Sequence, residues 1–180
     1  SWVAGALIWK WVLSPEYGAI NNILALFGIE GPSWLQSSKW AMPAIVLASV
    51  WKDMGYFGLM LMSGLQGINQ EYYDAAAIDG AGKIKQFTRI TLPLLTPTLF
   101  FVLIISLINS FQLFTQIMIM TPDGGPLGST MVMVERIYKC GFRYYEMGTA
   151  AAYSWILFAI LLLLTMVQMK LQNKWVNYDD

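Results

Sequence analysis

Two long stretches of the sequence contain no charged residue, Ile90–Pro122 and Met147–Met169. Each is longer than the roughly 20 apolar residues that a helix needs to cross about 30 Å of hydrocarbon. Inside lipid a helix satisfies its own backbone hydrogen bonds, whereas an open strand leaves them unpaired. We therefore expect one membrane-spanning helix at about residues 93–120 and another at about residues 148–168.

A third apolar stretch, at residues 40–63, is interrupted only by Lys52 and Asp53, and we expect it to span the membrane as well. A fourth, at residues 1–13, is too short to cross a bilayer. Because the chain begins with Ser instead of Met, we interpret this stretch as the remnant of a span in a longer protein. The predicted fold class is all-α: a polytopic membrane helical bundle in a single transmembrane domain, with three full spans and the remnant of a fourth.

The composition supports a membrane protein and excludes several classes of function. Hydrophobic residues make up 57% of the chain and charged residues 12%, about half the roughly 25% of a soluble domain. Eleven acidic residues balance eleven basic ones, which argues against a nucleic-acid partner because phosphate neutralisation needs a basic surplus. There is no histidine and one cysteine, Cys140, so a Ser-His-Asp triad, a His-ligated metal and an internal disulfide are excluded. We expect no catalytic residue, no metal and no cofactor.

Aromatic residues mark the expected span ends, where amphipathic rings prefer to lie. Trp34 and Trp40 flank the start of the span at 40–63, and Trp175 and Tyr178 follow the last span. The positive-inside rule leaves the orientation open, because basic residues are nearly equal in number on the two sides.

The segment between the last two spans, residues 121–146, has two parts. Residues 121–130 are rich in Gly and Pro, which is typical of turns. Residues 131–143 then repeat apolar side chains at helical spacing, with charged side chains largely on the opposite face. These charged side chains are Glu135, Arg136, Lys139 and Arg143. We predict a short amphipathic helix that lies on the membrane or packs across other helices.

The loop at residues 65–90 is rich in small residues, because Ala and Gly fill six of the eight positions in Ala75–Gly82. The alanines favour helix, whereas Gly80 and Gly82 favour a stop and a sharp turn. Apolar residues then recur at helical spacing from Ile84 onwards. The loop is therefore predicted to form a helix, a glycine turn and a second helix. It lacks the glycine and Ser/Thr positions of a P-loop, so we do not expect it to bind ATP itself.

One set of spacings in this loop is specific. Asp74-Ala75-Ala76 is followed after three residues by Gly80 and, after nine more, by Ile90-Thr91-Leu92-Pro93. This pattern resembles the cytoplasmic loop of the membrane permease subunits of binding-protein-dependent ABC importers, whose signature is Glu-Ala-Ala, three residues, Gly, nine residues and Ile-x-Leu-Pro. The one departure is Asp at position 74, whose side chain is one methylene shorter than Glu. The resemblance extends over nearly the whole chain, because further segments are similar to the sugar-type branch of these permeases: Trp9–Asn21, Trp51-Lys52, Gly64–Gln66, Leu94–Pro97, Gly124–Pro126 and Thr130.

The resemblance implies that residues 65–90 form a cytoplasmic coupling loop that docks into an ATPase subunit. That partner would hydrolyse ATP, so the chain itself is expected not to be an enzyme. By position match, the coupling residues are Asp74, Ala75, Ala76, Gly80, Ile90, Leu92 and Pro93.

The resemblance also implies a location in the inner, or plasma, membrane of a prokaryote, with residues 121–146 outside. The implied partners are a cytoplasmic ABC ATPase dimer, a second permease subunit and an extracytoplasmic solute-binding protein, beside the lipid bilayer. A sugar or sugar-like solute is favoured. A permease for another solute class and a membrane docking protein without transport are the alternatives.

Polar residues inside the expected spans predict a solute pathway. Two sets each fall on one helical face, within an arc of roughly 100–120° at 100° per residue. The sets are Ser49, Lys52, Asp53, Tyr56 and Ser63 in the earlier span, and Ser106, Asn109, Gln112 and Gln116 in the next. Because polar groups that face lipid are costly, both faces are expected to meet protein or water.

We predict that the pathway is lined by Lys52, Tyr56, Asn109, Gln112 and Gln116. Hydrogen bonding between helices, for packing alone, is the alternative role for these side chains. Lys52 and Asp53 are adjacent in sequence and diverge by about 100°, so they need not pair with each other.

Overall fold

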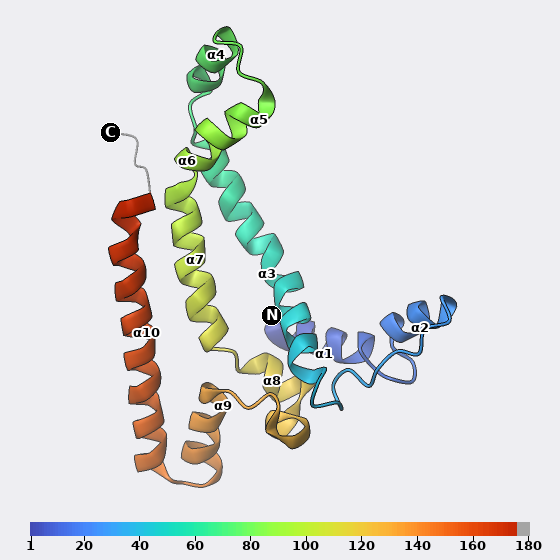
Figure 1. Cartoon of the computed structure of the whole chain (residues 1–180). Helices are drawn as coiled ribbons and strands as arrows, with labels where there is room; N and C mark the ends of the chain where they lie inside the picture. Colours follow the sequence, from blue (N-terminus) through green and yellow to red (C-terminus); the bar gives the residue numbers. More distant parts are fainter. Residues whose placement is uncertain (176–180) are drawn as a thin grey trace. The chain divides into compact units, whose positions relative to one another are not determined.

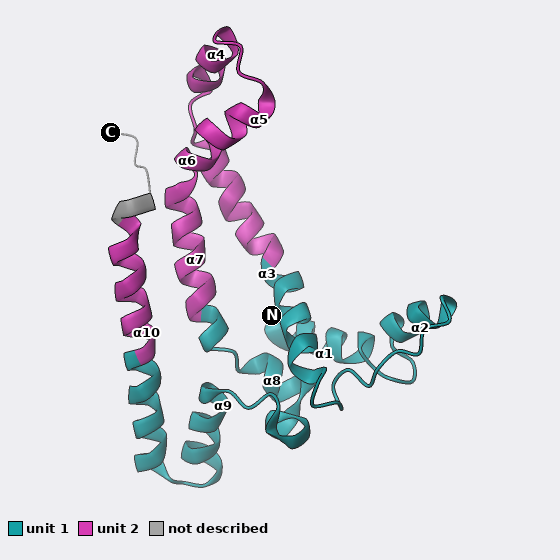
Figure 2. Cartoon of the chain, viewed as in Figure 1, with its two compact units in different colours: residues 1–53, 109–159 teal, residues 54–108, 160–180 magenta. Residues whose placement is uncertain are grey.

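The structure is a computed structural model that describes residues 1–175, with side chains through residue 172. Every regular element within residues 1–175 is helical. The chain divides into two compact units, one of residues 1–53 and 109–159 and the other of residues 54–108 and 160–180 (Figure 2). We call them unit 1 and unit 2. Tyr178, expected at the membrane interface, lies outside the described residues, as does the side chain of Trp175.

The helical elements follow one another along the chain, and the longest connection between them, residues 27–40, joins α2 to α3 (Figure 1). They are α1 (Trp2–Val12), α2 (Ala19–Leu26), α3 (Ala41–Gln66), α4 (Gln70–Ile78), α5 (Lys83–Gln86), the π-helix η1 (Phe87–Thr91), α6 (Leu92–Leu94), α7 (Thr96–Phe111), α8 (Thr115–Met120), the 3-10 turns η2 (Pro122–Gly124) and η3 (Pro126–Gly128), α9 (Met133–Tyr138), the π-helix η4 (Lys139–Arg143) and α10 (Met147–Trp175).

Two of these helices are long and apolar enough to cross a membrane. They are α3, over Ala41–Gln66, and α10, over Met147–Gln172. Both lie where the apolar stretches at residues 40–63 and 147–169 predicted spans, and α3 extends three residues beyond the expected end at residue 63. Helix α1 is apolar but has only 11 residues, so it is too short to span on its own.

The helix expected at about residues 93–120 is not continuous. The helix bends by 61° between Leu94 and Thr96. The cause is Pro97, whose ring lacks an N–H and would clash with the carbonyl group of Pro93 in a straight helix. That carbonyl oxygen instead accepts a hydrogen bond from the Thr96 hydroxyl at 2.6 Å.

A second interruption ends α7 at Phe111, and residues 112–114 separate it from α8. The N–H of Gln112 donates to the carbonyl oxygen of Asn109 at 3.1 Å, which closes the last turn. Phe114 then has non-helical backbone angles, φ −140° and ψ −62°. The bent pair formed by residues 83–94 and 96–111 counts as a third span only if the two parts are taken together.

The core of unit 1 is formed where α1 and α8 pack side by side against the first half of α3 (Figure 1). Its buried residues are Ala6, Leu13, Ala44, Ile45, Ala48, Ile117 and Met120. The alanines at positions 44 and 48 are one turn apart, and their small side chains let neighbouring helices approach closely. The rings of Trp9 and Trp51 meet edge to face at 5.7 Å between centroids, which adds an aromatic contact between α1 and α3.

In unit 2 the end of α3 approaches the start of α7. A side chain on Gly64 would place its Cβ 2.5 Å from the Thr98 hydroxyl oxygen and 2.9 Å from a Leu95 methyl group. A glycine is therefore needed at position 64 for this close packing. The contact holds the two helices that lead into and out of the loop at residues 65–90.

Candidate coupling loop and solute pathway

Helix α4 starts at a side-chain cap in unit 2. The Asn69 side-chain oxygen accepts a hydrogen bond from the Glu71 backbone N–H at 3.1 Å. Glu71 also places a negative charge in the first turn, where the helix dipole favours it. The alanines at positions 75–77 then continue the helix with the residue type of highest helix propensity.

Gly80 ends α4 in a Schellman motif. The N–H of Gly80 donates to the Ala77 carbonyl oxygen at 3.0 Å, and that of Ala81 donates to the Ala76 carbonyl oxygen at 2.9 Å. This arrangement needs a left-handed residue, and Gly80 has φ +75°. A Cβ at this position would meet no atom within 4 Å. The motif therefore requires glycine here for its backbone angle and not for space.

The second half of the loop is tied back to the first. The Gln86 amide donates to the Ala81 carbonyl oxygen at 3.1 Å. The hydroxyl groups of Tyr73 on α4 and Thr91 in η1 are hydrogen-bonded at 2.9 Å, and Thr91 is buried. This bond fixes α4 against the base of the helix that continues as α6. The sequence reading missed it, because nothing in a linear pattern pairs two hydroxyl groups 18 positions apart.

The predicted coupling residues lie at the two ends of this loop. Asp74, Ala75 and Ala76 are on α4, Gly80 follows it, and Ile90, Leu92 and Pro93 are in η1 and α6. Large apolar side chains are exposed between them: Ile78 is 88% exposed and Ile84 83%. Exposed apolar groups beside charged ones are typical of a surface that another protein covers.

The predicted pathway residue Lys52 has two partners in unit 1. Its Nζ atom lies 3.3 Å from the Asp53 carboxylate, so these neighbours do pair. The same ammonium group lies 4.5 Å from the ring centre of Trp2 on α1, a cation–π contact. Tyr56 follows one turn later on α3, with its side chain exposed. Lys52 thus joins α1 to α3 while its charge is balanced.

The polar stripe expected on the next span is not one helical face. Asn109 lies in α7 and Gln112 in the interruption after it, and both are exposed. Gln116 lies in α8 and is buried. The 120° arc assumed an unbroken helix, and the interruption at residues 112–114 removes that assumption.

The segment after α8 carries a charged network in unit 1. Arg143 and Lys139 both pair with the Asp123 carboxylate, the latter at 3.6 Å. The hydrogen bond and charge of Arg143, followed by the charge of Lys139, hold the pKa of Asp123 below its usual value. Asp123 has a left-handed backbone conformation, φ +62°, within the Gly-rich turn.

The amphipathic helix expected at residues 131–143 needs correction. Helix α9 ends at Tyr138 and continues as the π-helix η4. Glu135, expected on a polar face, is completely buried, and Lys139 is nearly so. Their side chains form an ion pair at 3.1 Å, which is why two charges are tolerated inside the unit.

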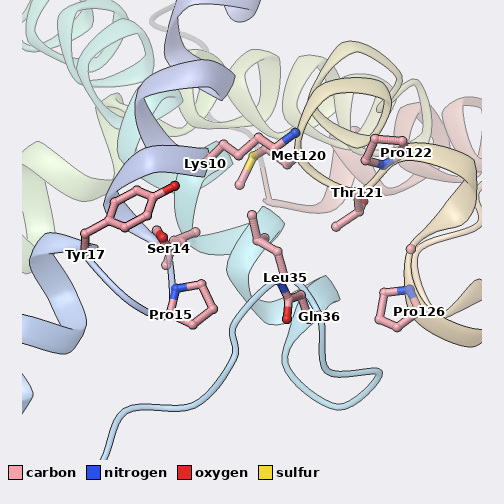
Figure 3. A pocket seen from close by; sticks show the side chains of 12 residues that line it. Lys10, Ser14, Pro15, Tyr17, Leu35, Gln36, Met120, Thr121, Pro122 and Pro126 are labelled. Carbon is pink, nitrogen blue, oxygen red and sulfur yellow. The ribbon is translucent and has the colours of Figure 1, made fainter.

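A cavity of about 510 Å³ opens beside the end of α1 (Figure 3). Its walls come from three segments of unit 1, and none of the predicted pathway residues lines it. The residues that line the cavity are Lys10, Leu13, Ser14, Pro15, Tyr17, Leu35, Gln36, Met120, Thr121, Pro122, Gly125 and Pro126. Lys10 is the charged group in a lining that is otherwise apolar or neutral. Among residues with described side chains, no group of three or more Cys, Asp or Glu residues is placed to hold a metal ion.

The family model described as "Binding-protein-dependent transport system inner membrane component" matches residues 2–178. The chain belongs to this family. It is thus an all-helical membrane permease component, and the resemblance found in the loop spacing is confirmed.

Two curated relatives of this permease component are named for their solutes. The sulfoquinovosyl glycerol transport system permease protein SmoG of Agrobacterium fabrum is 38% identical over 165 residues, which are 92% of this chain and 53% of SmoG. The sn-glycerol-3-phosphate transport system permease protein UgpA of Escherichia coli is 36% identical over 174 residues, which are 97% of this chain and 59% of UgpA. The chain therefore spans little more than half the length of these relatives.

A solved structure shares the fold of this permease component. It is the crystal structure of a bacterial ABC transporter involved in the import of the acidic polysaccharide alginate. The two superpose with a TM-score of 0.86 at 25% identity, over 97% of this chain and 61% of the other.

Proposed function

We propose that this protein is the transmembrane permease subunit of an ATP-driven ABC importer for a sugar or sugar-like solute. The observation that carries the proposal is the loop at residues 65–90. Its Asp-Ala-Ala, Gly and Ile-x-Leu-Pro positions have the family spacing, and Gly80 has the backbone angle that only glycine adopts freely. In this role α3, the bent pair ending in α7, and α10 are three spans, and residues 65–90 are cytoplasmic.

The coupling step is docking of α4 and the turn at Gly80 into an ATPase subunit. Ile78 and Ile84 supply exposed apolar contacts, and Asp74 supplies a charge at the first signature position. The Tyr73–Thr91 hydrogen bond passes movement of α4 to the start of the next helix. ATP hydrolysis takes place in the partner, so this chain contributes binding and movement but no covalent chemistry.

The solute assignment rests on the relatives and on side-chain chemistry. The named solutes are sulfoquinovosyl glycerol, sn-glycerol-3-phosphate and alginate. Amide and hydroxyl groups suit such hydroxyl-rich compounds because they can both donate and accept hydrogen bonds. Lys52, Tyr56, Asn109 and Gln112 remain the pathway candidates. Gln116 is buried in α8, so we assign it to packing between helices.

The cavity beside α1 is a second place for solute on the proposed outer side. Its volume falls within the range of about 300–1,000 Å³ that holds small ligands. Ser14, Tyr17 and Gln36 offer hydrogen bonds there, beside the apolar faces of the prolines.

The proposal is tested with Gly80→Asp in the reconstituted complex. We expect the variant to insert and to assemble, but solute-stimulated ATPase activity and uptake to fall strongly. Gly82→Asp is the matched control, because Gly82 has φ −69°, which any residue adopts, and open space around it. Unchanged uptake in Gly80→Asp would refute the coupling role.

The two alternatives give different results in the same assay. A docking protein without transport shows ATPase binding but no solute stimulation. A permease for another solute class shows stimulation by amino acids or peptides and none by sugars.

A further inference from the structure

Helix α2 and the turn after it carry exposed apolar side chains without charge. No Asp, Glu, Lys or Arg occurs from Tyr17 to Ile29, and Glu16 and Glu30 flank this stretch. Leu26 is 84% exposed and Phe27 77%. Figure 1 shows α2 projecting from unit 1. A charge-free apolar surface of this kind needs a nonpolar environment.

The large exposed apolar side chains of α2 and the turn after it lie on one side of the helix. At 100° per residue, Ile23, Leu26 and Phe27 fall within an arc of about 100°. Ile20 borders this arc, about 20° beyond Phe27 on the same count, and packs against the core of unit 1. Ala25, which is also exposed, lies two positions from both Ile23 and Phe27 and therefore about 160° away from each. The outer surface of α2 is thus divided into an apolar side and a side suited to water.

The end of α2 leaves few backbone groups that need water. Gly28, at φ +72°, donates to the Ala25 carbonyl oxygen, and Ile29 donates to the Leu24 carbonyl oxygen, both at 3.0 Å. This Schellman motif satisfies carbonyl groups that a helix end normally leaves open. A helix closed in this way can tolerate contact with lipid.

Asn21 holds α2 at the level where α1 ends. Its amide donates to the carbonyl oxygens of Pro15 and Pro32 at 3.2 and 3.3 Å, and its oxygen accepts from the Trp34 indole at 2.7 Å. The connection from α1 is only six residues, positions 13–18. Helix α2 is therefore held close to the end of α1 and to the loop that leads into α3.

We propose that α2 lies in the headgroup and acyl-chain boundary of the bilayer, on the side where α3 begins, with Ile23, Leu26 and Phe27 among the acyl chains. Lipid is the occupant because α1, the preceding helix, also exposes large apolar side chains, including Leu7, Ile8 and Trp11. Helix α2 also offers no charge to a protein partner, and the apolar area that a helix buries is one source of its binding at a bilayer interface. This role is independent of which solute is carried.

The test uses spin labels on single cysteines at Ile23, Ala25 and Phe27 in the full-length protein, assembled in its complex in phosphatidylethanolamine–phosphatidylglycerol vesicles. The parent chain serves as the background control, since Cys140 is buried. Collision with oxygen reports lipid, and collision with a water-soluble nickel chelate reports water.

We expect the oxygen-to-nickel collision ratio at Ile23→Cys and Phe27→Cys to exceed that at Ala25→Cys severalfold. Equal ratios at all three sites would overturn the proposal. So would labels at 23 and 27 that neither reagent reaches, because that result means that protein covers the face. If Phe27→Cys fails to assemble, Ile23→Cys alone gives the comparison with Ala25→Cys.

Discussion

Helices α2 and α4 are short, exposed and closed by the same glycine motif, yet they carry different charges. Gly28 has φ +72° and Gly80 has φ +75°, and each donates its N–H to the carbonyl group three positions before it. Helix α4 bears Glu71 and Asp74, whereas α2 bears no charge. The same C-terminal glycine motif thus ends two helices with different surfaces. The charged surface of α4 suits a protein partner in water, and the uncharged surface of α2 suits lipid.

The two helices are also held by different numbers of asparagine side-chain hydrogen bonds, and removing these bonds should have the largest effect on stability. Asn21→Ala removes three side-chain hydrogen bonds around α2 and should lower the free energy of unfolding by about 2–3 kcal/mol, at roughly 1 kcal/mol each. Asn69→Ala removes the one cap of α4 and should cost about 1 kcal/mol. Thermal unfolding in detergent compares the two variants. Equal shifts would show that Asn21 does not tie the loop around α2 in place.

The next test separates conformation from function. Gly28→Ala and Gly80→Ala each force a side chain into the left-handed region, at a cost of about 1–2 kcal/mol. We expect solute-stimulated ATPase activity to fall only in Gly80→Ala, because only α4 is proposed to meet the ATPase. Gly82→Ala, at φ −69°, is the neutral control. A loss of stimulation in Gly28→Ala would break the comparison.

The smallest effect concerns the hydrogen bond that ties α4 to η1. Tyr73→Phe and Thr91→Val each remove one hydroxyl group of the pair that is 2.9 Å apart. A double-mutant cycle on the free energy of unfolding should give a coupling energy of about 1 kcal/mol between the two residues. Coupling efficiency, measured as solute transported per ATP, should fall by the same amount in both single variants and in the double variant. Additive losses would mean that the two hydroxyl groups act separately.

Sequence patterns predicted α3 and α10 well because lipid imposes length and apolarity on any helix that crosses it. The bend at Leu95 follows from Pro97, but the sequence analysis treated residues 93–120 as one helix. The interruption after Phe111 carries no Pro or Gly, so the pattern of residues 106–116 gave no warning. Helical periodicity alone could not show it.

The tertiary pairs of the site were beyond sequence reasoning. Glu135 was predicted on the polar face because it is charged, whereas the structure pairs it with Lys139 in the interior of the unit. The hydrogen bonds of Asn21 and of Tyr73 depend on which loops meet in space. The spacing of the coupling motif, in contrast, could be read directly, because the helix, its glycine stop and the return to the membrane are consecutive in the chain.

The bend between residues 83–94 and 96–111 has a mechanical consequence. Two helical segments joined at a bend do not transmit a displacement along a single axis. At a bend of 61°, a displacement along the first segment has a larger component across the axis of the second segment than along it, because the angle is closer to perpendicular than to straight. In the proposed coupling step, displacement of the loop along the first segment would therefore move α7 mainly sideways instead of lengthwise. The hydrogen bond between the Thr96 hydroxyl and the Pro93 carbonyl group lies at this bend.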